Sequence, residues 1–234
     1  MNDRKKKHSD EVRNRMNAVI FDMDGVLFDT ERLCERSWLA VAEKHKLPGM
    51  KEIFPRCIGL NANDSRRIVM DAYGEEFDYP GFREEASVWF WDYIEKNGLP
   101  VMTGVREILE WLKENRWKVG LASSTRRSSV LNHLEQAGLR DYFSVIITGD
   151  MVEHSKPQPD IYLLACRELG VEPTQAFAIE DSPNGIRSAH RAGMLPLMVP
   201  DMIAPDEEMR SLSHRIFQNL TEVLDYFKQA GERV

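Results

Sequence analysis

The sequence predicts an α/β protein: a parallel sheet covered by helices, with a helical segment inserted after the first strand. Two observations predict this fold. An apolar, β-branched run that starts at Ala18 ends in two carboxylates, Asp22 and Asp24, and then in Gly25, as a buried strand leading into a sharp turn does. From Val101 onward, apolar strand-like runs alternate with amphipathic helical patterns, which is typical of a parallel sheet covered on both faces.

The individual elements follow from the hydrophobic periodicity. After Gly25 the pattern becomes helical, and we expect helices up to about Leu47, from about Asn63 to Tyr73 and from about Phe82 to Lys96. Later strands are expected at Lys118–Ser123, Ser144–Thr148, Ala176–Glu180 and Leu195–Val199, with a short edge strand near Ile216-Phe217. The helices between them are expected at about 104–115, 127–137, 160–169, 184–192 and 221–230.

These elements predict a sheet core, residues 17–29 and 99–234, and a helical insert, residues 30–98. The insert leaves the chain at the carboxyl end of the first strand, so it can close over that end as a lid. Residues 1–16 are expected to form a basic, disordered extension, because residues 1–17 carry six lysines or arginines against three acids.

The composition excludes several classes of protein. Hydrophobic residues make up 42% of the 234 residues, enough for a substantial core. The formal net charge of −7 argues against nucleic acid as a partner, because contacts to its backbone need a basic surface. We expect no membrane association, since no apolar run is long enough for a span and residues 1–16 lack the apolar stretch of a signal peptide. Three widely spaced cysteines give no disulfide framework, so we expect a cytoplasmic protein. We also expect a monomer or weak dimer.

Polar residues stand at the predicted carboxyl ends of four strands, and in a parallel sheet these ends converge on one crevice. They are Asp22, Asp24, Ser123, Ser124, Lys156, Glu180 and Asp181. Carboxylates that lie close together need a cation between them. Mg²⁺ suits this site best, because in proteins it is typically bound by one or two carboxylates together with phosphate oxygens and water. A lysine, hydroxyls and backbone N–H groups suit a phosphate dianion. Each residue alone is an ordinary loop residue, and only the combination predicts a phosphate and magnesium site.

The motifs Asp22-x-Asp24-Gly25-Val26, Ser123, Lys156-Pro157 and Glu180-Asp181-Ser182-x-x-Gly185, in this order, resemble the four motifs of the haloacid dehalogenase superfamily. The helical insert is similar to the small α-helical cap, of the C1 type, in the β-phosphoglucomutase-like branch. This resemblance implies a Rossmann-like core with such a cap, and a hydrolase that works through an aspartyl-phosphate.

The resemblance also implies roles for the two motif aspartates. Asp22 would be the nucleophile that attacks phosphorus. Asp24 would protonate the leaving oxygen and then deprotonate the attacking water. True haloacid dehalogenases lack the second aspartate, because a halide leaves without a proton. Asp24 therefore favours phosphoryl transfer over dehalogenation.

The remaining roles follow from the same resemblance. The ligands of Mg²⁺ would be Asp22, the backbone carbonyl of Asp24, Asp181 and, directly or through water, Glu180. The transferring phosphoryl group would be bound by Ser123, the backbone of Ser124 and Lys156. We therefore predict a Mg²⁺-dependent phosphatase whose partner is a small phosphorylated metabolite, a sugar phosphate.

A sugar phosphomutase of the β-phosphoglucomutase type is the alternative. Such mutases carry a histidine in the first cap helix and an arginine in the cap's substrate loop, where this chain has Cys34 and Ala62. Asn61, Asn63 and Arg66, in the same loop, are candidates for binding sugar hydroxyls, although a helix N-cap and a solvated arginine are the commoner reason for these residue types.

Two alternatives from other classes account for less of the sequence. A module that accepts a phosphoryl group or senses a ligand would use the pair Asp22 and Asp24 together with Lys156, but the completeness of the site, and Asp24 especially, argues against it. A glycosyltransferase that binds metal through Asp-x-Asp gives no role to Lys156 or to Glu180-Asp181.

Overall fold

A computed structural model describes residues 16–58 and 62–231. The chain divides into two compact units: one contains the segment up to Phe28 together with the chain from Val101 onward, and the other is Asp29–Pro100. Residues 1–15 of the basic extension expected at 1–16, and the candidate Asn61, lie outside the described residues.

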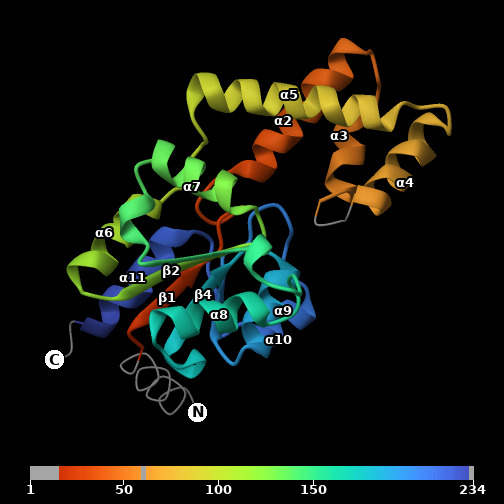
Figure 1. The fold of residues 1–234 in the computed structure, drawn as a ribbon. Helices are drawn as coiled ribbons and strands as arrows, with labels where there is room; N and C mark the ends of the chain where they lie inside the picture. Colours follow the sequence, from red (N-terminus) through yellow and green to blue (C-terminus); the bar gives the residue numbers. More distant parts are fainter. Residues whose placement is uncertain (1–15, 59–61, 232–234) are drawn as a thin grey trace. The chain divides into compact units, whose positions relative to one another are not determined.

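The first unit is built on a six-stranded sheet in which every neighbouring pair is parallel (Figure 1). The strand order is β3-β2-β1-β4-β5-β6. The strands are β1 (Ala18–Phe21), β2 (Lys118–Ser123), β3 (Val145–Thr148), β4 (Ala176–Glu180), β5 (Leu195–Met198) and β6 (Arg215–Ile216). The order reverses between β1 and β4, as in doubly wound sheets. The predicted Rossmann-like α/β fold with a helical insert is confirmed.

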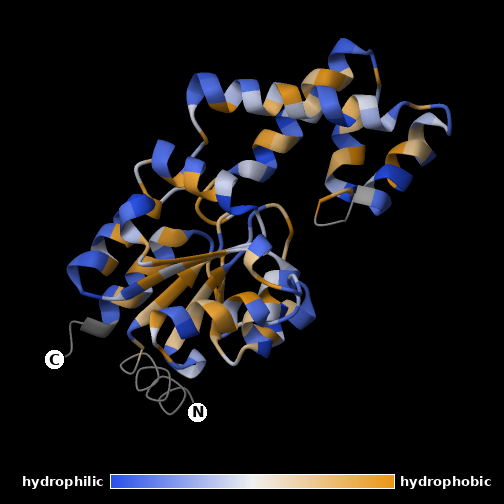
Figure 2. Cartoon of the chain, in the orientation of Figure 1, coloured by the Kyte–Doolittle hydropathy of each residue, from blue (hydrophilic) through white to orange (hydrophobic). Residues whose placement is uncertain are grey.

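Helices connect the strands of this unit. They are α6 (Val105–Glu114), α7 (Arg127–Gln136), α8 (Asp160–Leu169), α9 (Pro183–Arg191), α10 (Glu207–Leu212) and α11 (Leu220–Gly231), with 3₁₀ turns η2 (Arg140–Tyr142), η3 (Gly149–Met151) and η4 (Pro173–Gln175). The strands are hydrophobic along their length, whereas the helices carry both hydrophobic and hydrophilic residues (Figure 2). This difference is expected when both faces of the sheet are buried and each helix keeps one face in water.

Strand β1 is buried on both faces because helices cover both. Successive residues of a strand point to opposite sides. Ala18 and Ile20 pack into one core cluster with side chains of α8 and α9. On the opposite face, Phe21 packs edge to face against Phe143, with 6.1 Å between the ring centroids. The central strand that carries the two motif aspartates is therefore fixed from both sides.

Most core elements lie where the periodicity predicts them. Strands β2 and β4 and helix α8 have the predicted bounds, and the edge strand is the two-residue β6. Helix α10 was not predicted, because six residues are too few to show a helical period. In the insert, the predicted start of the third helix at Phe82 is three residues late. Asp78 caps that helix by accepting a hydrogen bond from the Gly81 N–H at 3.0 Å, and proline occupies its first turn.

The second unit is helical. Its elements are α2 (Thr30–Lys44), α3 (Met50–Ile53), η1 (Phe54–Arg56), α4 (Ala62–Tyr73) and α5 (Tyr79–Asn97). Helices α2 and α5 pack against each other. Trp38, which is 2% exposed, is the centre of the packing: its ring lies 5.2 Å from Phe54 and 5.4 Å from Phe82, both edge to face. The insert therefore has its own aromatic core.

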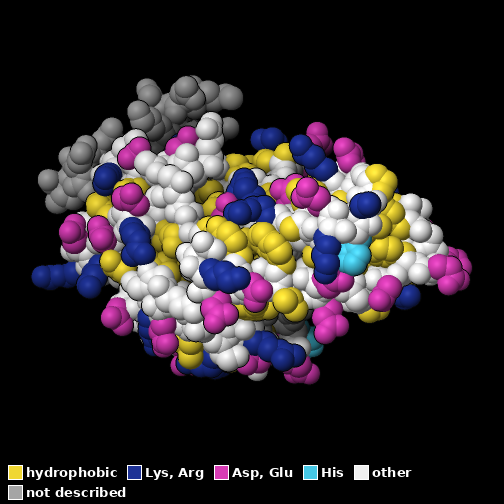
Figure 3. Space-filling view, turned by 90° about the horizontal axis from the view of Figure 1, so that it is seen from above, with side chains coloured by type: hydrophobic (Ala, Val, Ile, Leu, Met, Phe, Trp, Pro, Cys, Tyr) yellow, Lys and Arg dark blue, Asp and Glu magenta, His cyan; other side chains and the backbone are white. Residues whose placement is uncertain are grey.

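The surface carries charges of both signs. On the face shown in Figure 3, lysines and arginines are interspersed with acidic side chains, and hydrophobic side chains lie between them. No helix within the described residues is both long and apolar enough to cross a membrane.

We predict that Trp38→Ala lowers the free energy of unfolding of the protein by about 3–5 kcal/mol, because it leaves a cavity among three aromatic rings. The control is Trp91→Ala, in the same unit, where the side chain is 45% exposed and the expected loss is below about 1 kcal/mol. Urea unfolding followed by circular dichroism measures both. Equal losses in the two variants would contradict this packing.

Candidate active site

The first strand ends at the centre of the candidate site. Asp22 directly follows β1, is 8% exposed, and donates its backbone N–H to the Ile179 carbonyl of β4 at 2.9 Å. The chain then turns at Gly25, whose φ of 78° lies in the left-handed region and whose missing Cβ leaves room for the Asp181 carboxylate. A side chain at this position would be strained and would overlap that carboxylate. The motif glycine thus allows β1 and β4 to present their acids together.

Lys156 lies among the acids. Its ammonium donates hydrogen bonds to Oδ1 of Asp22 at 2.5 Å, to Oε1 of Glu180 at 2.7 Å and to the Ala122 carbonyl at 3.0 Å. The side chain is only 7% exposed, and that of Glu180 is fully buried. One lysine therefore contacts the ends of β1, β2 and β4.

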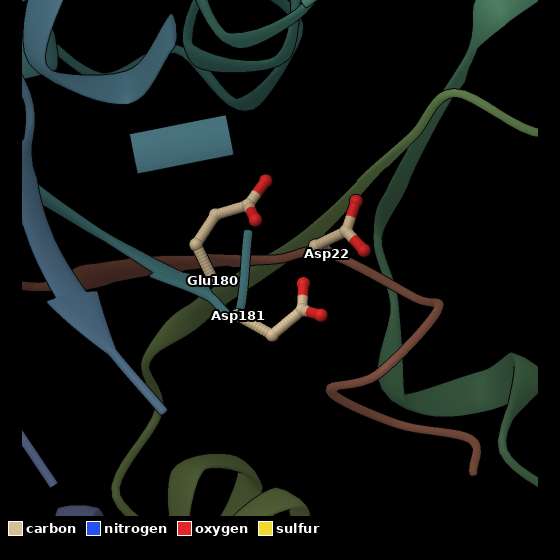
Figure 4. Close-up of side chains that lie close together, drawn as sticks. All are labelled: Asp22, Glu180 and Asp181. Atoms are coloured by element: carbon tan, nitrogen blue, oxygen red, sulfur yellow. The ribbon is translucent and has the colours of Figure 1, made fainter. Parts of the chain in front are cut away.

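Three carboxylates form a cluster that can hold a metal ion. Asp22 comes from the end of β1, and Glu180 and Asp181 come from the end of β4, with one ligand oxygen of each within 4.8 Å of the others. Figure 4 shows the three acidic side chains close together. When ionised, the two buried acids and the half-buried Asp181 carry more negative charge than one lysine balances, and all the donors are oxygens. A hard divalent cation such as Mg²⁺ fits both the charge and the donor set.

The pKa values follow from this crowding. Burial raises the pKa of Asp22 to about 7, although Lys156 acts in the opposite direction. Burial, together with Glu180 and Asp22, raises the pKa of Asp181 well above its usual value. Burial alone would lower the pKa of Lys156, but the two carboxylates outweigh it and the pKa is raised. The lysine is thus permanently charged, and the acids favour any further cation that enters.

Two residues hold Glu180 in place: Tyr162, which sequence reasoning missed, and Ser182, which it gave only as part of the fourth motif. The Tyr162 hydroxyl on α8 donates to Oε1 of Glu180 at 2.7 Å, and the tyrosine ring lies 5.0 Å from the Lys156 ammonium. The Ser182 hydroxyl donates to Oε2 at 3.1 Å and accepts the Gly185 N–H as the cap of α9. The periodicity of α8 places Tyr162 on its buried face, and a buried tyrosine needs a partner for its hydroxyl. The sequence could therefore show that Tyr162 is buried and that its hydroxyl needs a hydrogen-bond partner, but not that this partner is Glu180.

The loop after β2 supplies the predicted hydroxyl residues. Ser123 is fully buried, and its Oγ accepts the N–H of Thr125 at 3.1 Å, whereas Ser124 is exposed. The Thr125 hydroxyl donates to Oδ2 of Asp24 at 2.9 Å. Sequence reasoning stopped at Ser124 and missed Thr125. The run of hydroxyl residues at the strand end was the available signal.

The insert candidates belong to the second unit. Asn63 and Arg66 are both exposed and lie in the first turns of α4. Asp64, between them, forms an ion pair with Arg67. A role for Asn63 and Arg66 in binding substrate stays a prediction.

The comparisons with known proteins agree with these motifs. Residues 19–199 match the family described as haloacid dehalogenase-like hydrolase. A phosphorylated carbohydrates phosphatase of Thermotoga maritima is 37% identical over 183 residues, 76% of this chain and 82% of that protein. A beta-phosphoglucomutase of Bacillus subtilis is 29% identical over 222 residues, 91% of this chain and 97% of that protein. A crystal structure of a HAD family hydrolase from Deinococcus radiodurans, with bound phosphate and sodium, superposes with a TM-score of 0.79 at 25% identity and covers 92% of this chain and 96% of that one.

We predict that Mg²⁺ stabilises the protein against unfolding, because it binds the buried carboxylates of the folded state. At a Mg²⁺ concentration of 100 times the dissociation constant, the gain is about 2.7 kcal/mol. Thermal melts in Mg²⁺ and in EDTA measure it. Asp181→Asn should reduce the difference in Tm between the two conditions, whereas Asp225→Asn, an exposed residue of α11, should leave it as in the wild type. A difference that is unchanged in Asp181→Asn would place the metal elsewhere.

Proposed function

Because the chain belongs to the haloacid dehalogenase-like hydrolase family, we propose that it is a Mg²⁺-dependent phosphatase that hydrolyses a phosphorylated carbohydrate through an aspartyl-phosphate. The family predicted from the motifs and the enzyme class, a phosphoric monoester hydrolase of the HAD type, are both confirmed. The metal, the covalent mechanism and the substrate class are the proposed part. The three cysteines are free thiols, which suits a reducing compartment and supports a cytoplasmic location.

One observation carries the proposal: a second carboxylate, Asp24, follows the buried Asp22 at the end of β1, and Lys156 contacts Asp22 directly. The Lys156 ammonium beside Asp22 compensates negative charge, which favours the approach of a nucleophile to an anionic phosphate. Asp24 is less buried and bonds to the Thr125 hydroxyl rather than to Lys156. The two carboxylates thus differ in environment, which is how one site gives two acids different roles.

In the first half of the proposed reaction, a carboxylate oxygen of Asp22 attacks phosphorus and the bond from phosphorus to the substrate oxygen breaks. Asp24, in its protonated form, gives its proton to that oxygen, so the sugar leaves as an alcohol. In the second half, Asp24 takes a proton from water as the water attacks phosphorus. Inorganic phosphate leaves, and Asp22 returns to a carboxylate.

The groups around the two aspartates stabilise the charge of the phosphoryl group. The positive charge of the Lys156 ammonium lies next to Asp22 and would offset the negative charge of the phosphoryl oxygens. Ser123 and the backbone N–H of Ser124 offer donors at the end of β2. Bound Mg²⁺, held by Asp22, Asp181, Glu180 and the carbonyl of Asp24, would supply further positive charge next to the phosphoryl oxygens.

The substrate class rests on relatives rather than on the core. The Thermotoga maritima relative is a phosphatase of phosphorylated carbohydrates, and the Bacillus subtilis relative is a mutase of a sugar phosphate. Both names favour a phosphorylated carbohydrate as substrate. A mutase must exclude water and readmit a sugar hydroxyl. By the resemblance stated above, Cys34 and Ala62 replace the histidine and arginine of mutase caps, which favours the phosphatase.

We predict that Asp22→Asn abolishes the release of phosphate, because an amide cannot form the covalent intermediate. The measurement is inorganic phosphate released from a sugar phosphate in the presence of Mg²⁺. Asp225→Asn is the matched control and should retain wild-type turnover. If Asp22→Asn kept more than trace activity, Asp22 would not be the nucleophile.

We predict that a panel of phosphorylated sugars, polyols and nucleotides yields fast phosphate release from a sugar or polyol phosphate and no isomer. Phosphate release should be measured beside a coupled assay for isomerisation of a sugar phosphate. Isomer formation with little phosphate would overturn the proposed phosphatase in favour of the mutase.

A further inference from the structure

The side chain of Asp24 is fixed by a neighbour that none of the four motifs contains. Among residues 16–58 and 62–231, the Asp24 carboxylate has one hydrogen-bond partner, the hydroxyl of Thr125, which donates to Oδ2 at 2.9 Å. The backbone around Asp24 is fixed separately. The N–H groups of Val26, Leu27 and Phe28 all donate to the Met23 carbonyl, at 3.4, 2.9 and 3.1 Å. The turn therefore fixes the backbone position of Asp24, and the hydrogen bond from Thr125 fixes the direction of its carboxylate.

Thr125 itself has little freedom. Its N–H donates to Ser123 Oγ at 3.1 Å, and its carbonyl accepts the Gly149 N–H at 3.2 Å. Gly149 comes so close to this loop that a Cβ atom there would overlap the Ser124 carbonyl. The loop is thus bonded within itself and packed against the end of β3. A threonine held in this way can orient another side chain.

The bond leaves the other oxygen of Asp24 available for chemistry. Because Oδ2 accepts the hydroxyl hydrogen of Thr125, the proton that Asp24 exchanges with substrate or water belongs on Oδ1. The same donation suits both the protonated and the ionised carboxyl. Thr125 can therefore hold one orientation of Asp24 through both halves of the reaction.

We propose that Thr125 is a positioning residue that aims Oδ1 of Asp24 at the leaving oxygen and then at the attacking water. This inference rests on the proposed function and deepens it. It assigns the loop Ser123–Thr125 two tasks: its first two residues bind the phosphoryl group, and its third orients the acid. The phosphoryl group and the proton donor are then placed by one short segment, so their relative position is fixed.

The test is Thr125→Val, which removes the hydroxyl and keeps the shape of the side chain. A substrate with an alcohol leaving group needs the proton from Asp24, whereas 4-nitrophenyl phosphate releases a phenolate that leaves without it. We expect kcat/KM of Thr125→Val to fall about 10- to 100-fold for a sugar or polyol phosphate, less than the whole contribution of about 10²–10⁴ from general acid catalysis. For 4-nitrophenyl phosphate, kcat/KM should change less than about threefold, because this ratio reports the steps up to loss of the leaving group. Thr125→Ser restores the hydroxyl and should restore both values.

Thr148→Val is the control for loss of a buried threonine hydroxyl at a neighbouring strand end. That hydroxyl donates to Asp150 at 2.6 Å and not to Asp24, so any effect should be equal on both substrates. An equal loss on both substrates in Thr125→Val, or no loss on the sugar phosphate, would overturn the role of Thr125 and leave the phosphatase standing. A wild type that releases phosphate from neither substrate would overturn the proposed function, and the role of Thr125 with it.

Discussion

The buried ammonium group of Lys156 offsets part of the negative charge of the site. It contacts Asp22 on one side and Glu180 on the other, and the Ala122 carbonyl between them. Loss of one partner from such a buried pair costs about 3–5 kcal/mol, because the remaining charge is left in a poor solvent. The lysine therefore ties the ends of β1, β2 and β4 together as well as serving the chemistry. The same cluster still carries excess negative charge, which is why a divalent cation suits it.

The charged groups at the ends of β1 and β4 meet because the strand order places these two strands side by side. Strands β1 and β4 are neighbours in the sheet although more than 150 residues separate them in the sequence, and the register pairs Phe21 with Ile179. Asp22 and Glu180 each stand one position beyond this pair. Between these two strands the chain order reverses, so the connections leave in opposite directions and open a crevice at the strand ends. The acidic cluster lies at this point, which is where open α/β sheets bind ligands.

Much of this was predictable because the chemistry stands at the ends of apolar runs. A strand end can be identified in the sequence, and parallel strands bring their ends to the same edge, so Asp22, Lys156 and Glu180 could be grouped without a structure. Tyr162 and Thr125 could not be placed in the same way. Their hydroxyl partners are set by tertiary packing: Thr125 meets Asp24, which is 101 residues away, and Tyr162 meets Glu180 because α8 packs beside the end of β4. Helix boundaries depended on local capping: Asp78 starts α5 earlier than its apolar pattern indicates.

In the proposed mechanism, a phosphatase and a mutase form the same aspartyl-phosphate and use Asp24 as the same acid and base, so the core residues serve both reactions. The two reactions differ in which hydroxyl reaches the phosphoryl group, that of water or that of a sugar. Burial raises the pKa of the Cys34 thiol to about 11, so at neutral pH it is uncharged and a weak donor. A histidine at that position would gain and lose a proton near neutrality, which a thiol of this kind does not do. Cys34 therefore does not exchange protons near neutrality as the histidine implied for mutase caps would, and this difference is a physical reason to favour the proposed hydrolysis.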